Sequence, residues 1–337
     1  TGMVPARICF PPNHTTPRVV KFMISIIMGI FKITTLKALR LDSFSSSLDL
    51  ANFSSSSSPL TKDLITRTLV STKITASEME GVPHHLIDIL EPTEEFNVFL
   101  FKEYACRAME KIYERGHIPI ITGGTGFYIQ SGLYDIEFEK SDEDKEYREY
   151  LYGLAEEKGK EYIHDMLRTV DEKSAEEIHF NNEKRVIRAL EYFKQTGKKI
   201  SEHNEEQKKN ESPYNFLYFV LNNDREVLYD RIDRRVDMMF DMGLTDEVIK
   251  LIKHGCTKDM TSMKAIGYRE FFEYFDGTAT LDDVRKKIKL DTRHFAKRQL
   301  TWFRREKEVT MLELHEFDNK DKLLKYMLEM IKEKNII

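Results

Sequence analysis

A glycine-rich segment, GGTG at positions 123–126, has residue types suited to holding an anion. It follows an apolar run at residues 118–122 and precedes a helical pattern, so we expect a strand, a tight loop and a helix N-terminus. Glycines let backbone amides approach an anion, a helix N-terminus favours negative charge, and Thr125 adds a hydroxyl donor. A strand-to-helix turn without a ligand is the alternative, and these four residues alone leave both open.

Two groups of cationic side chains could bind phosphate. In the segment KRVIR, Lys184 and Arg188 are four positions apart on one face of an expected helix, with Arg185 beside them. In the segment DRIDRRVDMMF, Arg231 and Arg235 have the same spacing. Cations that face an RNA backbone add salt-dependent affinity. Both groups could instead be solvated faces, and the second has possible ion-pair partners in Asp230, Asp233 and Asp237.

The densest cationic group lies at residues 285–307, which contain ten Lys or Arg residues and only two acids. Ile288, Phe295 and Trp302 repeat at intervals of seven, which predicts a buried apolar stripe on a long helix. Arg293 and Lys297 lie off that stripe. A helix with one apolar and one cationic face suits an RNA backbone or a pyrophosphate. An ordinary surface helix is the alternative, which the charge imbalance disfavours.

The order strand, helix, strand, glycine loop, helix predicts an α/β fold with a parallel sheet. We expect strands at residues 22–31, 86–90, 118–122 and 215–221, and helices at residues 98–115, 225–254, 262–275, 281–307 and 320–334. Residues 136–202 are charged and helical in pattern, so we interpret them as an inserted all-helical domain. The α/β core then comprises residues 73–135 and 203–337, with residues 1–72 as its atypical N-terminal part.

The composition is that of an ordinary globular protein, with 41% hydrophobic and 32% charged residues. A net charge of −5 provides no overall cationic field for nucleic acid, so local clusters must bind it. Three widely spaced cysteines without a CxxC pair predict reduced thiols rather than a disulfide framework or a zinc site. His84 and His85 have no acids or cysteines at metal-ligand spacing, so we interpret both as structural.

The N-terminal region differs in character from the rest of the chain. Residues 43–58 contain nine serines, and such tracts bury too little apolar surface to become ordered. The apolar run at residues 22–31 is too short to span a bilayer. It could be a signal-peptide core, but no small-residue cleavage pattern follows it, and a strand of a parallel sheet is the favoured interpretation. We therefore expect a cytoplasmic protein without a membrane segment.

Five sequence blocks, taken together, resemble the bacterial tRNA dimethylallyltransferases, also called tRNA isopentenyl transferases. In order, these blocks are GVPHHLIDILEP, IPIITGGTGFYIQSGL, NEKRVIRALEYFKQTGKKIS, MKAIGYREFFEY and TRHFAKRQLTWFRRE. The similarity extends from about residue 73 to about residue 315. Each block alone is weak evidence, but five in order at the family's spacing are specific.

The resemblance implies a P-loop-type α/β core with an inserted helical domain that grips the anticodon stem-loop of tRNA. It implies transfer of a dimethylallyl group from dimethylallyl diphosphate to the exocyclic amine of the adenosine 3′ of the anticodon, with that base flipped out. Mg²⁺ and cationic side chains would stabilise the departing pyrophosphate. The protein is expected to act as a monomer, and no protein ligand of the metal can be assigned.

Individual roles also follow from the resemblance. Thr125 corresponds to a threonine beside the reacting adenine, and Arg235 corresponds to a catalytic-site arginine that faces the diphosphate. Gly123, Gly124 and Arg298 are expected to bind the diphosphate. The implied tRNA-binding residues are Arg148, Lys184, Arg185, Val186, Ile187 and Arg188.

The N-terminal segment departs from the family pattern. The family begins with a P-loop, GxxxxGK[ST], and an aspartate that acts as general base follows a few dozen residues later. Counting back from residue 73, the P-loop should fall near residues 34–41, which read TTLKALRL, and the aspartate near Pro59. We hypothesise that a coding-frame disturbance or local divergence produced residues 1 to about 70. The alternative function is therefore that of a relative that binds tRNA without catalysis. A third possibility is a nucleotide kinase-like P-loop enzyme that acts on a small molecule, and the missing P-loop sequence argues against it as well.

Overall fold

The computed structural model describes residues 20–27, 79, 81–134, 136 and 144–337. The serine-rich tract, Cys9 and the positions where a P-loop was expected lie outside these residues. The chain divides into two compact units, and the second, Tyr134–Ser212, is inserted within the first, which comprises Thr1–Leu133 and Pro213–Ile337. Each unit is described by itself below.

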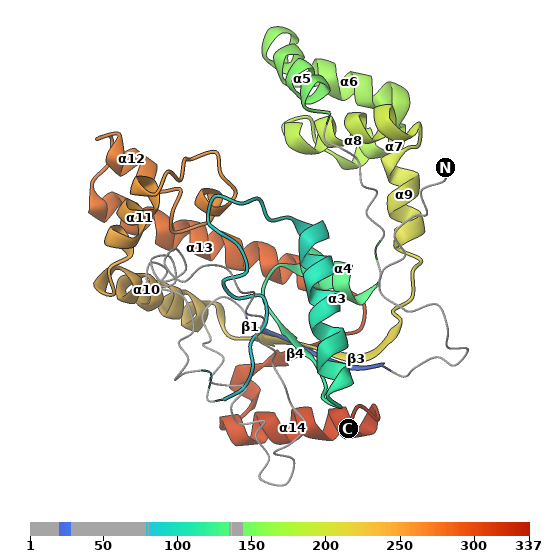
Figure 1. Cartoon of the computed structure of the whole chain (residues 1–337), viewed down its shortest axis with the longest axis vertical. Coiled ribbons are helices and arrows are strands. Elements are labelled where there is room, and N and C mark those ends of the chain that lie inside the picture. Colours follow the sequence, from blue (N-terminus) through green and yellow to red (C-terminus); the bar gives the residue numbers. More distant parts are fainter. Residues whose placement is uncertain (1–19, 28–78, 80, 135, 137–143) are drawn as a thin grey trace. The chain divides into compact units, whose positions relative to one another are not determined.

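A four-stranded parallel sheet forms the centre of the first unit (Figure 1). Its order is β2 (Ile120–Thr122), β1 (Val20–Ile27), β3 (Tyr214–Asn222) and β4 (Val309–Glu313). In the register, Ser25 of β1 lies opposite both Thr122 of β2 and Phe219 of β3. The parallel sheet and the strands expected near residues 22–31, 118–122 and 215–221 are confirmed. No strand was expected near residues 309–313, so β4 was not predicted from the sequence.

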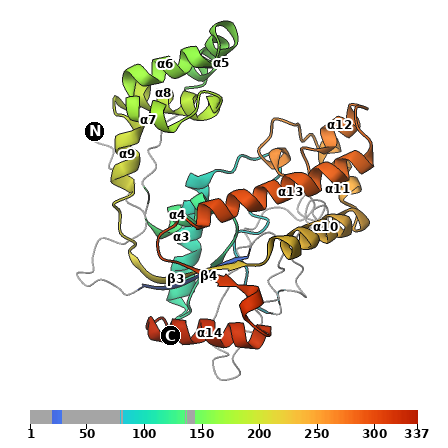
Figure 2. The same ribbon diagram turned by 180° about the vertical axis from the view of Figure 1, so that it is seen from behind.

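Helices cover both faces of this sheet, as the two opposite views show (Figures 1 and 2). The described helices of this unit are α3 (Val98–Glu114), α4 (Gly126–Leu133), α10 (Arg225–Asp241), α11 (Leu244–Lys253), α12 (Phe271–Phe275), α13 (Leu281–Phe303) and α14 (Lys320–Glu333). Alternate side chains of a strand point to opposite faces, so β3 contacts both layers. Leu217 and Phe219 pack with Leu323 and Met327 of α14. On the other face, the ring of Tyr218 meets that of Phe303 edge-on.

The helices after β3 form their own apolar cluster, and they differ from the sequence-based expectation at two glycines. The expected helix over residues 225–254 is two helices, because Gly243 has a φ of +96° that an L-residue rarely adopts. Within residues 262–275, only Ser262–Lys264 and α12 are helical, since Gly267 has a φ of +102°. Buried residues from α10, α11, α12 and α13 fill this cluster, among them Val236, Val248, Phe271 and Ile288.

Residues 86–90, expected to form a strand, are irregular. Leu86 and Asp88 have φ angles of 61° and 55°, in the left-handed region. Two such residues separated by one position cannot continue an extended strand. The apolar run is therefore a loop rather than a strand.

The inserted unit is helical throughout its described residues. It contains α5 (Lys145–Lys158), α6 (Lys160–Val170), α7 (Glu172–Glu177), α8 (Glu183–Thr196) and α9 (Ile200–Gln207). Its core includes Leu151, Ile163 and Leu167, each with a relative exposure of 0%. Asp171 is also buried and accepts hydrogen bonds from the backbone and hydroxyl groups of both Ser174 and Ser201. One carboxylate thus joins the start of α7 to the start of α9.

Candidate functional site

The loop at residues 123–126 connects β2 to α4 at the carboxyl end of the sheet. Thr125 is exposed, and its carbonyl oxygen accepts hydrogen bonds from the amides of Tyr128 (3.0 Å) and Ile129 (3.2 Å), so it begins the helix. Gly123 is exposed too, and an added Cβ there would have no atom within 4 Å. The exposed side of the loop therefore combines a threonine hydroxyl, an open glycine and a helix N-terminus, as an anion site requires.

Packing explains the other two glycines of the loop. A Cβ on Gly124 would lie 2.0 Å from Nε2 of Gln299, and a Cβ on Gly126 would lie 2.2 Å from the indole of Trp302. Both partners belong to α13, one turn apart. The Gln299 amide also donates a hydrogen bond to the Gly124 carbonyl at 2.8 Å. The alternative interpretation of GGTG as a tight turn thus accounts for Gly124 and Gly126 but not for Gly123.

The buried face of α13 differs from the expected stripe. Val284, Ile288, Ala296, Gln299 and Phe303 are buried. Two residues that were expected in the stripe, Phe295 and Trp302, keep 38% and 39% of their surface exposed. In the second half of α13 the buried residues Ala296, Gln299 and Phe303 are three or four positions apart, so the buried face there lies beside the line of Phe295 and Trp302.

Arg298 lies on α13, the helix that contacts the glycine loop. Its side chain is exposed, and its guanidinium lies 5.7 Å from the centroid of the Phe295 ring. Just after the end of the same helix, burial raises the pKa of the Glu306 carboxyl to about 6. A hydrogen bond from the Trp302 indole acts in the opposite direction and lowers this pKa, but its effect is smaller. The end of α13 therefore presents cationic, aromatic and titratable groups beside the loop.

Ion pairs join α10 to α13. Asp237 on α10 pairs with Lys289 at 2.7 Å and with Arg285 at 3.4 Å, and Asp233 pairs with Arg293. The aspartates around Arg235 thus neutralise cations of the neighbouring helix, and part of the dense cationic group on α13 serves to hold α10. Arg235 itself is half-buried on α10.

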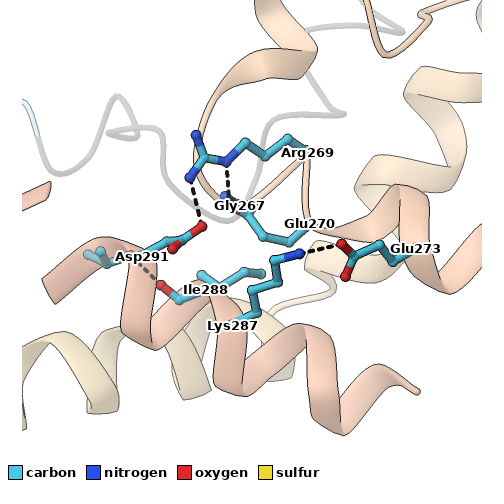
Figure 3. Close-up of polar contacts among 8 residues, drawn as sticks. Gly267, Arg269, Glu270, Glu273, Lys287, Ile288 and Asp291 are labelled. Carbon is cyan, nitrogen blue, oxygen red and sulfur yellow. Dashed lines mark hydrogen bonds and ion pairs between the residues drawn. The ribbon is translucent and has the colours of Figure 1, made fainter. Parts of the chain in front are cut away.

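The segment IGYRE forms a polar network rather than an exposed RNA-binding face (Figure 3). Glu270 is buried and accepts hydrogen bonds from the Gly267 amide at 2.8 Å and from Nε of Arg269 at 2.7 Å. The Arg269 guanidinium also pairs with Asp291 of α13 at 2.7 Å. Next to it, the Tyr268 hydroxyl donates to buried Glu247 at 2.5 Å. The network fixes the turn before α12 against the middle of α13.

The cationic segment of the inserted unit lies on α8. Lys184, Arg185 and Arg188 are exposed, and none of these side chains pairs with an acid within the described part of the chain. Val186 and Ile187 are 0% and 1% exposed and belong to the apolar core, so their side chains are not on the surface that carries these cations. Residues on opposite faces of one helix cannot share one surface.

Arg148 of α5 is bound to the buried carboxylate of Glu191 on α8. Nε and Nη2 of Arg148 donate to the two carboxylate oxygens at 2.7 and 3.1 Å. Only 6% of the Glu191 side chain is exposed, against 31% for Arg148. The arginine expected to contact tRNA therefore also joins two helices of the inserted unit.

Replacing Arg148 with methionine is expected to lower the free energy of unfolding of the inserted unit by about 3 kcal/mol, because the variant leaves a buried charge without a partner. Hydrogen exchange of α5 and α8 in the full chain measures this loss. The double variant Arg148→Met, Glu191→Gln should recover part of it. Equal exchange in the wild-type chain and the single variant would contradict a structural role.

The adjacent histidines lie in the irregular segment before α3. Burial, with Arg115 and Lys111 nearby, lowers the pKa of His85 to about 4, so its imidazole is neutral at physiological pH. Nδ1 of His84 lies 2.8 Å from the carbonyl oxygen of Val82. Both features agree with a structural interpretation.

Among the described residues, no group of three or more His, Cys, Asp or Glu side chains could hold a metal ion. Cys106 and Cys256 are buried free thiols. None of the described helices combines the length and apolar character needed to cross a bilayer.

Gln299 and Glu270 were not singled out from the sequence, although each holds a part of the site in place. The sequence offered one indication of their importance: both residues lie within the family-like blocks AKRQLTW and IGYRE. In each block, a polar residue occupies a buried helical or turn position. Without the fold, the sequence does not distinguish these buried polar residues from solvated ones.

Comparison with known proteins identifies the family. The family model described as IPP transferase matches residues 67–306. A tRNA dimethylallyltransferase of Lachnoclostridium phytofermentans is 52% identical over 265 residues, which are 79% of this chain and 85% of the relative.

Solved structures agree. The full-length tRNA isopentenylpyrophosphate transferase of Bacillus halodurans is 35% identical, with a TM-score of 0.60 over 94% of this chain and 98% of that one. A eukaryotic dimethylallyltransferase acting on tRNA is 25% identical, with a TM-score of 0.69 over 94% of this chain and 80% of that one. The chain, a mostly helical α/β protein with a small parallel sheet, belongs to the IPP transferase family.

Proposed function

We propose that this protein transfers a dimethylallyl group from dimethylallyl diphosphate to the exocyclic amine of the adenosine 3′ of the anticodon in tRNA. The observation that carries the proposal is the 52% identity to a tRNA dimethylallyltransferase over most of both chains. The loop at residues 123–126 supports it, because Thr125 and Gly123 are exposed where β2 ends and α4 begins.

The proposed core is of the P-loop type. The phosphate-binding loop of such proteins follows a parallel strand, and β1, in the middle of the sheet, has its carboxyl end beside that of β2. A diphosphate there would lie near Gly123, Gly124 and the helix that carries Arg298. The segment after β1 lacks GxxxxGK[ST], so the remaining contacts to phosphate must come from a different sequence.

In this proposal, the inserted unit binds the tRNA. Lys184, Arg185 and Arg188 present three exposed cations on one helix, which suits contacts to the RNA backbone. Thr125 would lie beside the reacting adenine, and Arg235 would face the diphosphate. Mg²⁺ would neutralise charge on the departing pyrophosphate when bound. We further propose a cytoplasmic monomer.

Prenyl transfer can be measured directly. The protein is incubated with unmodified tRNA, dimethylallyl diphosphate and Mg²⁺, and prenylated adenosine is quantified after digestion of the tRNA. Product formation supports the proposal. Binding of tRNA without product would instead indicate a relative that binds tRNA without catalysis, and a protein that does neither would contradict both functions.

Replacing Arg188 with alanine should weaken tRNA binding and make it less sensitive to salt. One lost phosphate contact reduces the slope of log K against log[salt] by about 0.7–0.9. Filter binding at several salt concentrations measures the slope. Arg168→Ala is the matched control, because Arg168 of α6 is exposed but already paired with Asp165. Equal slopes for both variants and the wild-type chain would remove Arg188 from the RNA-binding surface.

A further inference from the structure

The contact between α13 and the glycine loop is unusually close. At Gly124 and Gly126 the backbone leaves no room for a side chain, since the added Cβ atoms would lie 2.0 Å from Gln299 and 2.2 Å from Trp302. Real Cβ atoms essentially never approach other heavy atoms this closely. The two α13 residues are three positions apart, so they lie on one face and contact the loop on either side of Thr125.

Gln299 adds a directional bond to this contact. Its side chain is 6% exposed, and its Nε2 donates to the Gly124 carbonyl at 2.8 Å. The peptide plane that begins with this carbonyl continues into the amide of Thr125. A hydrogen bond that fixes the carbonyl therefore also fixes the direction of the Thr125 amide and the position of the Thr125 Cα, from which its side chain extends.

The second polar atom of the Gln299 amide is also informative. Its Oε1 is buried and accepts no hydrogen bond from any described residue. A buried acceptor without a donor costs free energy, so an apolar side chain of the same size would be favoured if packing were the only requirement. A glutamine at this position is explained by the bond that its amide nitrogen makes to the loop.

We infer that Gln299 is a positioning residue of the prenyl-transfer site: its amide holds the Gly124 carbonyl and so fixes Thr125 for the reaction. The inference rests on the proposed function, because Thr125 is assigned beside the reacting adenine there. Gln299 touches neither substrate in this assignment, and it acts through the backbone of the loop. Its loss therefore affects turnover more than the binding of tRNA.

Kinetics of Gln299→Met give the first test. Methionine keeps the length of the side chain and removes the donor, so kcat is expected to fall about tenfold, as for one lost hydrogen bond. The Kd for tRNA should change by less than about twofold. Ile288→Val is the matched control, since Ile288 is buried on the same helix away from the loop and its loss of packing lowers stability by a similar amount. A kcat unchanged by Gln299→Met, or lowered equally by Ile288→Val, would overturn the inference.

A double-variant cycle gives the second test. Gly124→Ala places a methyl group against the Gln299 amide, and Gln299→Ala removes that amide. If the two residues act through their contact, the loss of kcat in the double variant should be clearly smaller than the product of the losses in the two single variants. Multiplicative losses in the double variant would show that the two residues act independently.

Fluorescence separates this inference from the proposed function. Trp302 is the only tryptophan of the chain, and its indole lies against Gly126. In Gln299→Met the loop is released, so acrylamide should quench Trp302 at least about 1.5-fold more strongly than in Ile288→Val. These spectra need no substrate. Inactive wild-type protein with the expected change in quenching would contradict only the proposed function, and active wild-type protein with unchanged quenching and unchanged kcat in Gln299→Met would contradict only the inference.

Discussion

Replacing Asp171 with alanine should lower the free energy of unfolding of the inserted unit by about 4 kcal/mol. The Asp171 carboxylate is 1% exposed and accepts four hydrogen bonds, two from Ser174 and two from Ser201. The variant leaves four donors without their acceptor, and point variants that break a buried hydrogen-bond network reach losses of about 4 kcal/mol. Urea unfolding of the full chain, followed by hydrogen exchange of α7 and α9, measures the loss.

The control for this variant is Asp165→Ala. Asp165 lies on α6 of the same unit, and it makes an exposed ion pair with Arg168. Surface pairs contribute about 0–1 kcal/mol, so this variant should unfold almost as the wild-type chain does. If Asp165→Ala and Asp171→Ala unfold alike, Asp171 does not join the two helices energetically.

Asp171 should also make the inserted unit sensitive to acid. Burial opposes ionisation of its carboxyl, but the hydrogen bonds from Ser201 and Ser174 outweigh that effect and lower the pKa below its ordinary value of 3.8. A carboxyl with a lowered pKa in the folded state stabilises the fold above its unfolded pKa, and this contribution is lost as the pH falls through the folded pKa. Wild-type protein should therefore lose stability below about pH 4, with a steeper slope than Asp171→Asn.

Arg269→Met is expected to destabilise the first unit by about 3 kcal/mol. Arg269 lies between Glu270, whose side chain is 0% exposed, and Asp291, which is 24% exposed. Without the guanidinium, two neighbouring carboxylates face each other with little water, and breaking such a buried pair is costly. Thermal unfolding of the full chain measures the loss.

The loss in Arg269→Met should shrink in acid. Although burial opposes ionisation, the hydrogen bond from Arg269 helps to hold the pKa of Asp291 below its ordinary value. In the variant, the two carboxylates repel and the pKa of Asp291 rises, so the variant gains stability as the pH falls and loses it as the pH rises. Lys287→Met, which breaks the exposed pair with Glu273 seen in Figure 3, is the control and should cost less than about 1 kcal/mol at any pH. A pH-independent loss in Arg269→Met would contradict the electrostatic explanation.

Long periodic segments were predicted well because their side-chain pattern alone determines the element. α3 and α14 differ from expectation by one residue at the C-terminal end, and β3 by one residue at each end. The predicted helices and strands differ from the structure where the backbone conformation of single residues breaks the element that the hydrophobic pattern indicates. Leu86 and Asp88 adopt left-handed angles that their residue types do not indicate, and Gly243 ends a helix whose periodicity continues beyond it.

The candidate site residues that the sequence singles out are mostly exposed in the structure. GGTG stands out because glycines beside a strand are a local signal, and Lys184 and Arg188 stand out because their spacing places them on one helix face. Val186 and Ile187 were grouped with these cations because a block of matching sequence includes both faces of a helix, and their side chains lie in the core. Gln299 was missed because its role depends on a residue 175 positions earlier in the chain.

The order of synthesis leaves the central strand β1 without one of its partner strands for part of translation. β1 is made early, yet Tyr214 of β3, which pairs with Val20, leaves the ribosome only after the whole inserted unit. During that interval one edge of β1 has no partner strand, and such edges can pair with other chains. The inserted unit is held together by contacts between helices that are close in the sequence, so it can fold before β3 is available to complete the sheet. Slowing synthesis between the helical unit and β3 should therefore increase the dependence of this chain on chaperones.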